Sequence, residues 1–116
     1  MIYVIDDDEV MRGCLVRACG GVDTLEFANA IDAAEATGDK ELPKLIFLDI
    51  LLDGPDGFTF LNELASYEDT ARIPIVLVTS LDLSGRDFSN YGVVGILNKE
   101  TMTPSEVRNY VSKYVK

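Results

Sequence analysis

Four short apolar runs alternate along the chain with longer stretches of helical periodicity. The runs are almost continuous, are rich in branched side chains, and span residues 2–5, 45–48, 75–78 and 93–97. Continuous runs of this length are typical of strands that are buried on both faces of a parallel sheet. Residues 24–28 alternate instead, with Leu25 and Phe27 on one side and Glu26 on the other, which predicts an edge strand.

Helical periodicity fills the stretches between these strands. The five predicted helices cover residues 9–19, residues 30–37, a stretch carrying Phe58, Leu61 and Leu64, residues 84–91, and a stretch carrying Val107, Val111 and Tyr114. Thr103 and Glu106 form a predicted capping box at the start of the last helix, with Pro104 at its first position. Five strands alternating with five helices predict an α/β fold with a doubly wound parallel sheet, and 116 residues fit one domain over residues 1–116.

The net charge restricts the partners that this domain could bind. Twenty acidic residues against ten basic ones give a formal net charge of −10. Nucleic-acid binding requires a basic surface, and an anionic membrane surface is disfavoured for the same reason. No apolar run approaches the roughly 20 residues of a membrane span, and no basic-then-apolar leader opens the sequence. We therefore expect a cytoplasmic protein with neither a nucleic-acid nor a membrane partner.

Histidine is absent, and this excludes several kinds of site. Ser–His and Cys–His catalysis require a histidine, and so do metal sites with imidazole ligands. A metal site in this chain must therefore use oxygen ligands, which favours a hard cation such as Mg²⁺. Cys14 and Cys19 are five residues apart, which suits neither a CxxC redox motif nor a zinc site, and we interpret both as core residues of the first predicted helix.

Polar and charged side chains stand directly after four of the predicted strands. Residues 6–8 are three aspartates after the first strand, Asp49 ends the third, Thr79 ends the fourth, and Lys99 follows the fifth. The carboxyl ends of parallel strands meet at one edge of a sheet, where ligands bind in this class of fold. Crowded carboxylates repel one another unless a cation neutralises them, and a hydroxyl and an ammonium group can hold an anion beside that cation. This combination suits phosphoryl transfer.

The sequence resembles the receiver domain of two-component response regulators over essentially its whole length, and four segments carry the match. They are "VIDDDEVMR" at 4–12, "LIFLDILLDGPDGF" at 45–58, "IPIVLVTS" at 73–80 and "GILNKE" at 95–100. The resemblance implies a flavodoxin-like fold with the strand order 2-1-3-4-5. It also matches Gly57 to the glycine that opens the third helix of the family.

The resemblance implies a role for six residues at the predicted sheet edge. They are Asp49 as the phosphate-accepting carboxylate, Asp7 and Asp6 as the acidic pair that holds Mg²⁺, the backbone carbonyl of Leu51 as a further metal ligand, Thr79 as the switch hydroxyl, and Lys99 as the lysine that pairs with the phosphate. Three residues depart from the family pattern. Ile96 stands where an aromatic residue usually moves inward on activation, while Asp53 and Glu100 each stand where a proline is usual.

The resemblance also implies the partners of the domain. The phosphoryl group would come from a phosphohistidine on a sensor histidine kinase or a histidine phosphotransfer protein. The domain would catalyse its own phosphorylation and a slow dephosphorylation, without being an enzyme in the usual sense. Its output would pass through contacts with an unknown protein, and the resemblance allows a homodimer through the last two helices and the last strand.

Two other functions compete with this interpretation. The segment "YVIDDDEV" at 3–10 also fits a haloacid-dehalogenase-like phosphatase, in which Asp6 would be the nucleophile and Asp8 the general acid and base. That family needs a later acidic cluster that this sequence lacks, and the assignment leaves Asp49 without a role. The second alternative is a pseudo-receiver, a binding module of the same fold that never accepts phosphate.

Overall fold

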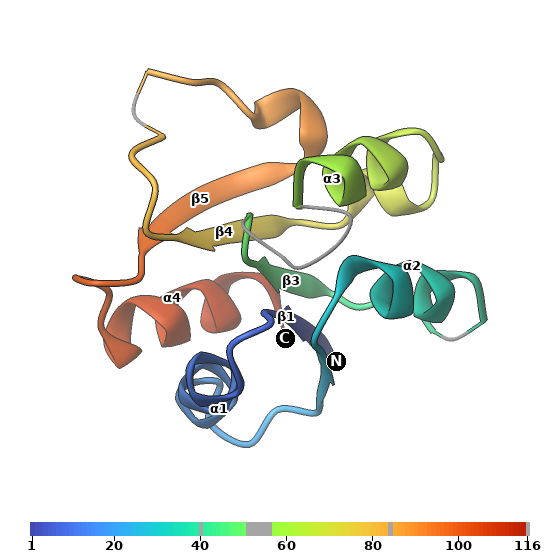
Figure 1. Ribbon diagram of the computed structural model, residues 1–116. Coiled ribbons are helices and arrows are strands. Elements are labelled where there is room, and N and C mark those ends of the chain that lie inside the picture. Colours follow the sequence, from blue (N-terminus) through green and yellow to red (C-terminus); the bar gives the residue numbers. More distant parts are fainter. Residues whose placement is uncertain (40, 51–56, 84, 116) are drawn as a thin grey trace.

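Five parallel strands form a single sheet in the order β2-β1-β3-β4-β5. The structure is a computed structural model that describes residues 1–39, 41–50, 57–83 and 85–115. The strands are β1 (Ile2–Ile5), β2 (Thr24–Phe27), β3 (Leu45–Leu48), β4 (Ile75–Thr79) and β5 (Val93–Asn98). The predicted doubly wound α/β sheet and its strand order are confirmed, and Figure 1 labels β1, β3, β4 and β5. Strand β2 lies at one edge, as its alternating pattern predicts.

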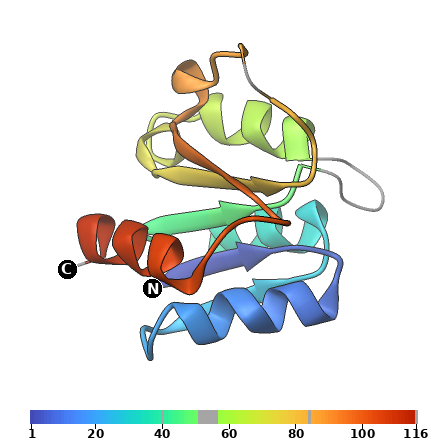
Figure 2. The same ribbon diagram turned by 90° about the vertical axis from the view of Figure 1, so that its left-hand side faces the viewer.

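Helices cover both faces of this sheet. The α-helices are α1 (Glu9–Ala18), α2 (Ala30–Asp39), α3 (Gly57–Ala65) and α4 (Pro104–Tyr114), and two short 3-10 turns are η1 (Thr70–Arg72) and η2 (Ser89–Tyr91). Helices α1 and α4 lie on one face, and α2 and α3 lie on the other (Figures 1 and 2). In the described part of the chain, no helix is both long enough and apolar enough to cross a membrane.

The core consists of two apolar layers that the sheet separates. Along β1, Tyr3 and Ile5 face the layer beneath α2 and α3, whereas Ile2 and Val4 face the layer beneath α1 and α4. Strands β3 and β4 divide their side chains in the same way, because successive residues of a strand point to opposite faces. All residues of these three strands are buried, which explains why their sequences are continuous apolar runs.

Side-chain caps define the starts of the helices. Asp8 is the N-cap of α1, and its carboxylate accepts hydrogen bonds from the backbone amides of Val10 and Met11. The capping box predicted from Thr103 and Glu106 is present at the start of α4. Such caps satisfy amide groups that have no partner within the helix. They fix where α1 and α4 begin after the loops that follow β1 and β5.

The fourth predicted helix, at residues 84–91, is not formed as an α-helix in the described residues of that segment. In the described residues between β4 and β5, the only helical element is the 3-10 turn η2. Gly85 and Gly92 both have positive φ, and the Asp87 carboxylate accepts the amide hydrogen of Ser89, which favours a turn over a helix. Leu83 and Phe88 still join the core, but Ile96 on β5 remains 41% exposed. The fold class is unchanged, with four α-helices in the described residues.

We expect Tyr3→Phe to stabilise the domain. Tyr3 is fully buried against Phe27, and no hydrogen-bond partner of its hydroxyl is found in the described structure. A buried polar group without a partner costs about 1–3 kcal/mol, so removing the oxygen should raise the free energy of unfolding by about 1 kcal/mol. Urea denaturation measures this as a higher midpoint at an unchanged m-value. The exposed Tyr67 provides the control, since Tyr67→Phe should leave the midpoint unchanged. A lower midpoint for Tyr3→Phe would show that the hydroxyl is bonded.

Candidate functional site

Three carboxylates gather at the carboxyl edge of the sheet. Asp6 directly follows β1 and Asp49 directly follows β3, and these strands are neighbours in the sheet. Asp6, Asp7 and Asp49 each place one carboxylate oxygen so that all three oxygens lie within 4.8 Å of one another. Asp6 is 0% exposed and Asp49 3% exposed, whereas Asp7 is exposed. The cluster therefore has a buried floor and one side chain open to solvent.

Lys99 extends from the end of β5 to the two buried carboxylates. Its Nζ lies 2.9 Å from Oδ2 of Asp49 and 3.1 Å from Oδ2 of Asp6, and its side chain is 17% exposed. The Lys99 backbone amide also donates to the Thr79 carbonyl at 3.0 Å, which holds the start of the side chain against β4. Burial alone lowers the pKa of Lys99, but the hydrogen bonds and charges of Asp49 and Asp6 together outweigh it and raise the pKa. Lys99 is therefore a cation at neutral pH.

One carboxylate oxygen of Asp6 is buried without a hydrogen bond in the described structure. Its Oδ1 accepts the Asp8 amide at 2.9 Å. Its Oδ2 lies at ion-pair distance from the Lys99 ammonium. This oxygen is buried, and it accepts no hydrogen bond within the described structure. Burial raises the pKa of the Asp6 carboxyl, although the Asp8 amide and Lys99 both act to lower it. An anionic oxygen in this environment gains more from a nearby cation than a solvated one does.

Thr79 ends the strand that lies between those of Asp49 and Lys99. It is the last residue of β4, the strand between β3 and β5, and it is fully buried. Its Oγ1 accepts the backbone amide of Leu81 at 3.1 Å, which closes a short turn after the strand. Four of the predicted site residues, Asp6, Asp49, Thr79 and Lys99, thus stand at the ends of four adjacent strands, with Asp7 beside them. The edge combines carboxylates, a hydroxyl and an ammonium group, as the sequence predicted.

The chain matches the model of the response regulator receiver domain family over residues 2–112. The chain belongs to this family. The receiver domain is 37% identical to the response regulator PleD of Caulobacter vibrioides over 86 residues, which are 72% of this chain but only 19% of PleD. It is 33% identical to the sensor histidine kinase CheAY of Helicobacter pylori over 69% of this chain and 10% of CheAY. The chain therefore spans only a fifth or less of the length of these relatives.

Solved structures show the same fold. A response regulator receiver protein from Pseudomonas putida superimposes with a TM-score of 0.85, at 22% identity, over 97% of this chain and 94% of that one. The flavodoxin-like architecture implied by the resemblance is thereby confirmed for this receiver domain. At such low identity the likeness concerns the fold alone.

Two further predictions concern the Leu51 carbonyl and Asp8. The Leu51 carbonyl, proposed as a metal ligand, lies outside the described residues, as does Asp53. Asp8, the general acid and base of the phosphatase alternative, caps α1 through its Oδ1, which accepts two backbone amides. The match to the receiver domain family gives the phosphatase interpretation no support.

The sequence did not reveal a role for Arg12, which the structure places against the acidic loop. Its Nη1 donates to the backbone carbonyl of Asp6 at 2.8 Å, and its Nε lies 3.4 Å from a carboxylate oxygen of Glu26. Arg12 follows the Asp8 cap by one helical turn, so its position on the loop side of α1 is readable from the sequence. The sequence does not show that Arg12 binds a backbone carbonyl.

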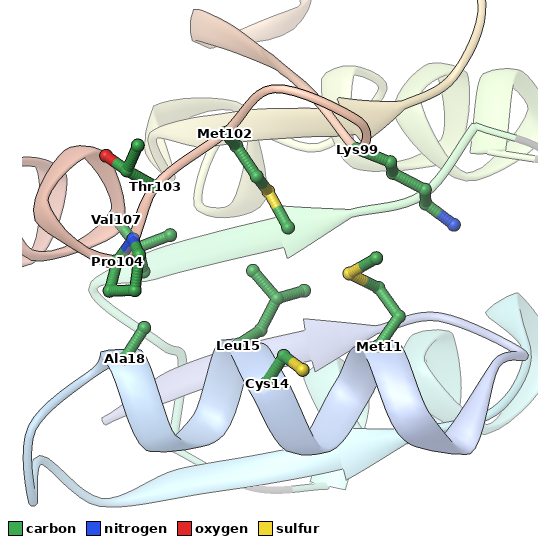
Figure 3. A pocket seen from close by; sticks show the side chains of 9 residues that line it. All are labelled: Met11, Cys14, Leu15, Ala18, Lys99, Met102, Thr103, Pro104 and Val107. Carbon is green, nitrogen blue, oxygen red and sulfur yellow. The ribbon is translucent and has the colours of Figure 1, made fainter.

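A cavity of about 250 Å³ between α1 and α4 borders the site through Lys99. Figure 3 shows Lys99 at one end of this cavity, with its amino group directed away from Met102. The lining is mostly apolar and includes Met11 and Cys14 of α1. Cys14 is exposed here, so its assignment to the core was wrong, whereas Cys19 is buried and burial raises the pKa of its thiol to about 11. The Lys99 stem thus forms a wall shared by the cavity and the acidic site.

Proposed function

We propose that this receiver domain accepts a phosphoryl group on Asp49 from a phosphohistidine of a histidine kinase or a histidine phosphotransfer protein. The observation that carries the proposal is the almost buried Asp49 carboxylate, held 2.9 Å from the Lys99 ammonium within a cluster of three carboxylates. An oxygen of Asp49 attacks the phosphorus, the phosphorus–nitrogen bond breaks, and the bonding electrons leave with the imidazole. Attack of water on the phosphorus later restores the carboxylate.

Lys99 and Thr79 have complementary roles in this proposal. The Lys99 ammonium leaves its ion pair with Asp49 and pairs with an oxygen of the transferred phosphoryl group, where it offsets the added negative charge. The Thr79 hydroxyl donates to another phosphoryl oxygen. Because that hydroxyl also accepts the Leu81 amide, its movement carries the segment after β4 with it. Phosphorylation would in this way change the surface that an output protein contacts.

The acidic cluster fits Mg²⁺. Three carboxylate oxygens within 4.8 Å of one another, including the buried Asp6 oxygen without a hydrogen bond, form the hard donor set that this cation prefers. Asp7, Asp6 and Asp49 would hold it, and we propose the Leu51 carbonyl as a further ligand. The bound cation would neutralise the charge of the transferring phosphoryl group.

The remaining expectations belong to the same proposal. We infer that residues 1–116 act as one receiver unit in the cytoplasm, and that its partners are proteins, because a net charge of −10 disfavours nucleic acids and anionic membranes. A homodimer through the last two helices and β5 stays a prediction. One of the two helices it invoked is the 3-10 turn η2, so such an interface would use α4 and β5 with the turn.

Phosphorylation is tested with a small phosphodonor. Incubation of the wild-type domain with acetyl phosphate and Mg²⁺ should add one phosphoryl group by intact mass, and hydroxylamine should remove it, as it does from acyl phosphates. Asp49→Ala should accept none, because the variant has no carboxylate at the attacking position. Asp8→Asn is the control and should be labelled like wild type, since asparagine also caps a helix. An unlabelled wild type would favour the pseudo-receiver, and a label that persists in Asp49→Ala would refute the assignment of Asp49.

Metal binding is tested by thermal unfolding. Mg²⁺ at about ten times its dissociation constant should stabilise the wild-type domain by about 1.4 kcal/mol through mass action. This amounts to a rise of about 6 °C in melting temperature for a domain of this size. Asp7→Asn should lose most of the rise, because it removes one carboxylate of the cluster, whereas Asp8→Asn should keep it. Equal shifts in both variants would place the cation elsewhere.

A further inference from the structure

Arg12 makes two contacts that join three elements around the acidic loop. From the second turn of α1, its Nη1 donates to the Asp6 carbonyl at 2.8 Å, and its Nε lies 3.4 Å from Oε1 of Glu26 on β2. Its side chain is 17% exposed, which is low for an arginine on the outer part of a helix, while that of Glu26 is 48% exposed. The planar guanidinium suits such a two-point contact, because it presents several donors in a fixed fork.

The contact with Asp6 fixes the peptide that leads into Asp7. The Asp6 carbonyl and the Asp7 amide belong to one planar peptide unit, so holding the carbonyl oxygen also sets the direction in which Asp7 leaves the strand. The other side of Asp6 is held as well, since its own amide donates to the Phe27 carbonyl at 3.0 Å. Asp7 is the exposed member of the carboxylate cluster, and Arg12 is the side chain that orients the backbone before it.

We propose that Arg12 is a positioning residue for the metal site, with Glu26 as its second anchor. It holds the Asp6–Asp7 peptide so that the Asp7 carboxylate faces Asp6 and Asp49 before a cation arrives. The inference rests on the proposed function, because it concerns the same three carboxylates. Arg12 donates to a backbone oxygen in this arrangement and leaves the cluster's carboxylate oxygens to the cation.

Charge and geometry predict different results when Arg12 is replaced by lysine. Arginine adds a positive charge near the site, and a positive charge by itself repels Mg²⁺, so a purely electrostatic role predicts tighter binding once the charge is removed. Arg12→Lys keeps the charge and loses the planar fork. If only charge matters, this variant binds Mg²⁺ like wild type, and if the two-point contact matters, it binds more weakly.

The decisive measurement is Mg²⁺ affinity by isothermal titration calorimetry. Arg12→Lys should weaken binding by about tenfold, the lower end of the loss seen when a group that orients metal ligands is removed. The matched control is Arg17→Lys on the same helix, because Arg17 is exposed and its Nη2 contacts the Cys14 sulfur rather than the loop. Its affinity should equal that of wild type. Equal affinities in Arg12→Lys and Arg17→Lys would overturn the proposal.

Two further readouts separate positioning from a loss of folding. The Asp8 amide donates to Oδ1 of Asp6 at 2.9 Å, so its chemical shift reports the loop geometry without metal or phosphate, and it should move in Arg12→Lys but not in Arg17→Lys. In phosphorylation by acetyl phosphate, the Mg²⁺ concentration for half-maximal rate should rise with the dissociation constant, while the rate at saturating Mg²⁺ stays near wild type. A lower rate at saturating Mg²⁺ with unchanged affinity would refute positioning.

Glu26→Gln tests the second anchor. It leaves Arg12 and its charge in place and weakens one of the two contacts, so Mg²⁺ binding should weaken by less than in Arg12→Lys. Combined with Arg12→Lys, it should add little, because residues that act through one another are not additive. Additive losses would show that Glu26 acts independently of Arg12. A wild type that binds no Mg²⁺ would instead count against the proposed function, so the two failures are distinguishable.

Discussion

Lys99→Met should slow phosphorylation of Asp49 by about a hundredfold at saturating Mg²⁺ and should destabilise the metal-free domain. Removing one well-placed donor from a developing charge costs about 10²–10³ in rate. Methionine keeps much of the apolar stem that borders the α1–α4 cavity, so the loss falls on the ammonium group. The rate is followed by mass spectrometry with acetyl phosphate. Lys113→Met on the exposed side of α4 is the control and should react like wild type.

The stability of the same variant should depend on pH and on Mg²⁺. Lys99 holds two carboxylates that are almost fully buried, and removing this cation from them should cost about 2 kcal/mol, less than for a fully buried pair because Lys99 keeps some solvent contact. Burial already raises the pKa of Asp6 in the wild-type protein. A carboxyl whose pKa is higher in the folded state costs stability at neutral pH, and this cost disappears as the pH falls through the folded pKa toward the unfolded value.

The variant's deficit in free energy of unfolding should therefore shrink as the solution is acidified, because protonation removes the unpaired charge. Mg²⁺ should shrink it at neutral pH by a different route, since the cation takes the place of the missing ammonium. Urea denaturation at several pH values, with and without Mg²⁺, measures both effects. A deficit that is independent of pH and of Mg²⁺ would show that Lys99 contributes packing rather than charge compensation.

The position of the candidate site residues was predictable because parallel topology determines where strand ends lie. Once residues 2–5, 45–48, 75–79 and 93–98 form neighbouring parallel strands, whatever follows each of them reaches the same edge. Residue type then restricts the chemistry, since carboxylates, a hydroxyl and an ammonium without any histidine leave few alternatives. The continuous burial of β1, β3 and β4 likewise follows directly from their apolar runs.

The features that the sequence did not predict depend on contacts that leave no periodic pattern in the sequence. Residues 84–91 were predicted to form a helix, but Phe88 and the preceding Leu83 reach the core from a turn-rich segment that Gly85 and Gly92 shape through positive φ. Cys14 shares the helical stripe of Leu15 and Ala18 yet faces the α1–α4 cavity and solvent. Arg12 looks like any helix-surface arginine, and its partner is a backbone oxygen, which carries no sequence signal. Local periodicity thus predicts elements better than it predicts which side chains meet.

Gly57→Ala should destabilise the domain by about 3 kcal/mol and displace the phosphoacceptor. A Cβ added at Gly57 would lie 2.7 Å from the Asp49 carbonyl oxygen and 2.7 Å from Cα of Ile50, and both are backbone atoms that cannot rotate away. Such overpacking typically costs about 1–3 kcal/mol, and the upper end applies where backbone must move. Gly57 is not among the glycines with positive φ, so the requirement here is space. Its amide also donates to the Ile50 carbonyl at 2.9 Å, which fastens the start of α3 to the segment after β3.

The displaced backbone is the one that carries Asp49, so function should fall along with stability. Folded Gly57→Ala at low temperature should bind Mg²⁺ more weakly and accept phosphate more slowly than wild type. Gly38→Ala is the matched control, because Gly38 lies near the end of α2 and the described structure has no atom within 4 Å of an added Cβ there. Alanine favours a helix over glycine, so this variant should be about 0.5 kcal/mol more stable and fully active. Urea denaturation measures the stability of both variants, and Mg²⁺ titration measures their affinity for the cation. A Gly57→Ala protein with wild-type stability would mean that α3 and the Asp49 backbone can move apart without a loss of stability.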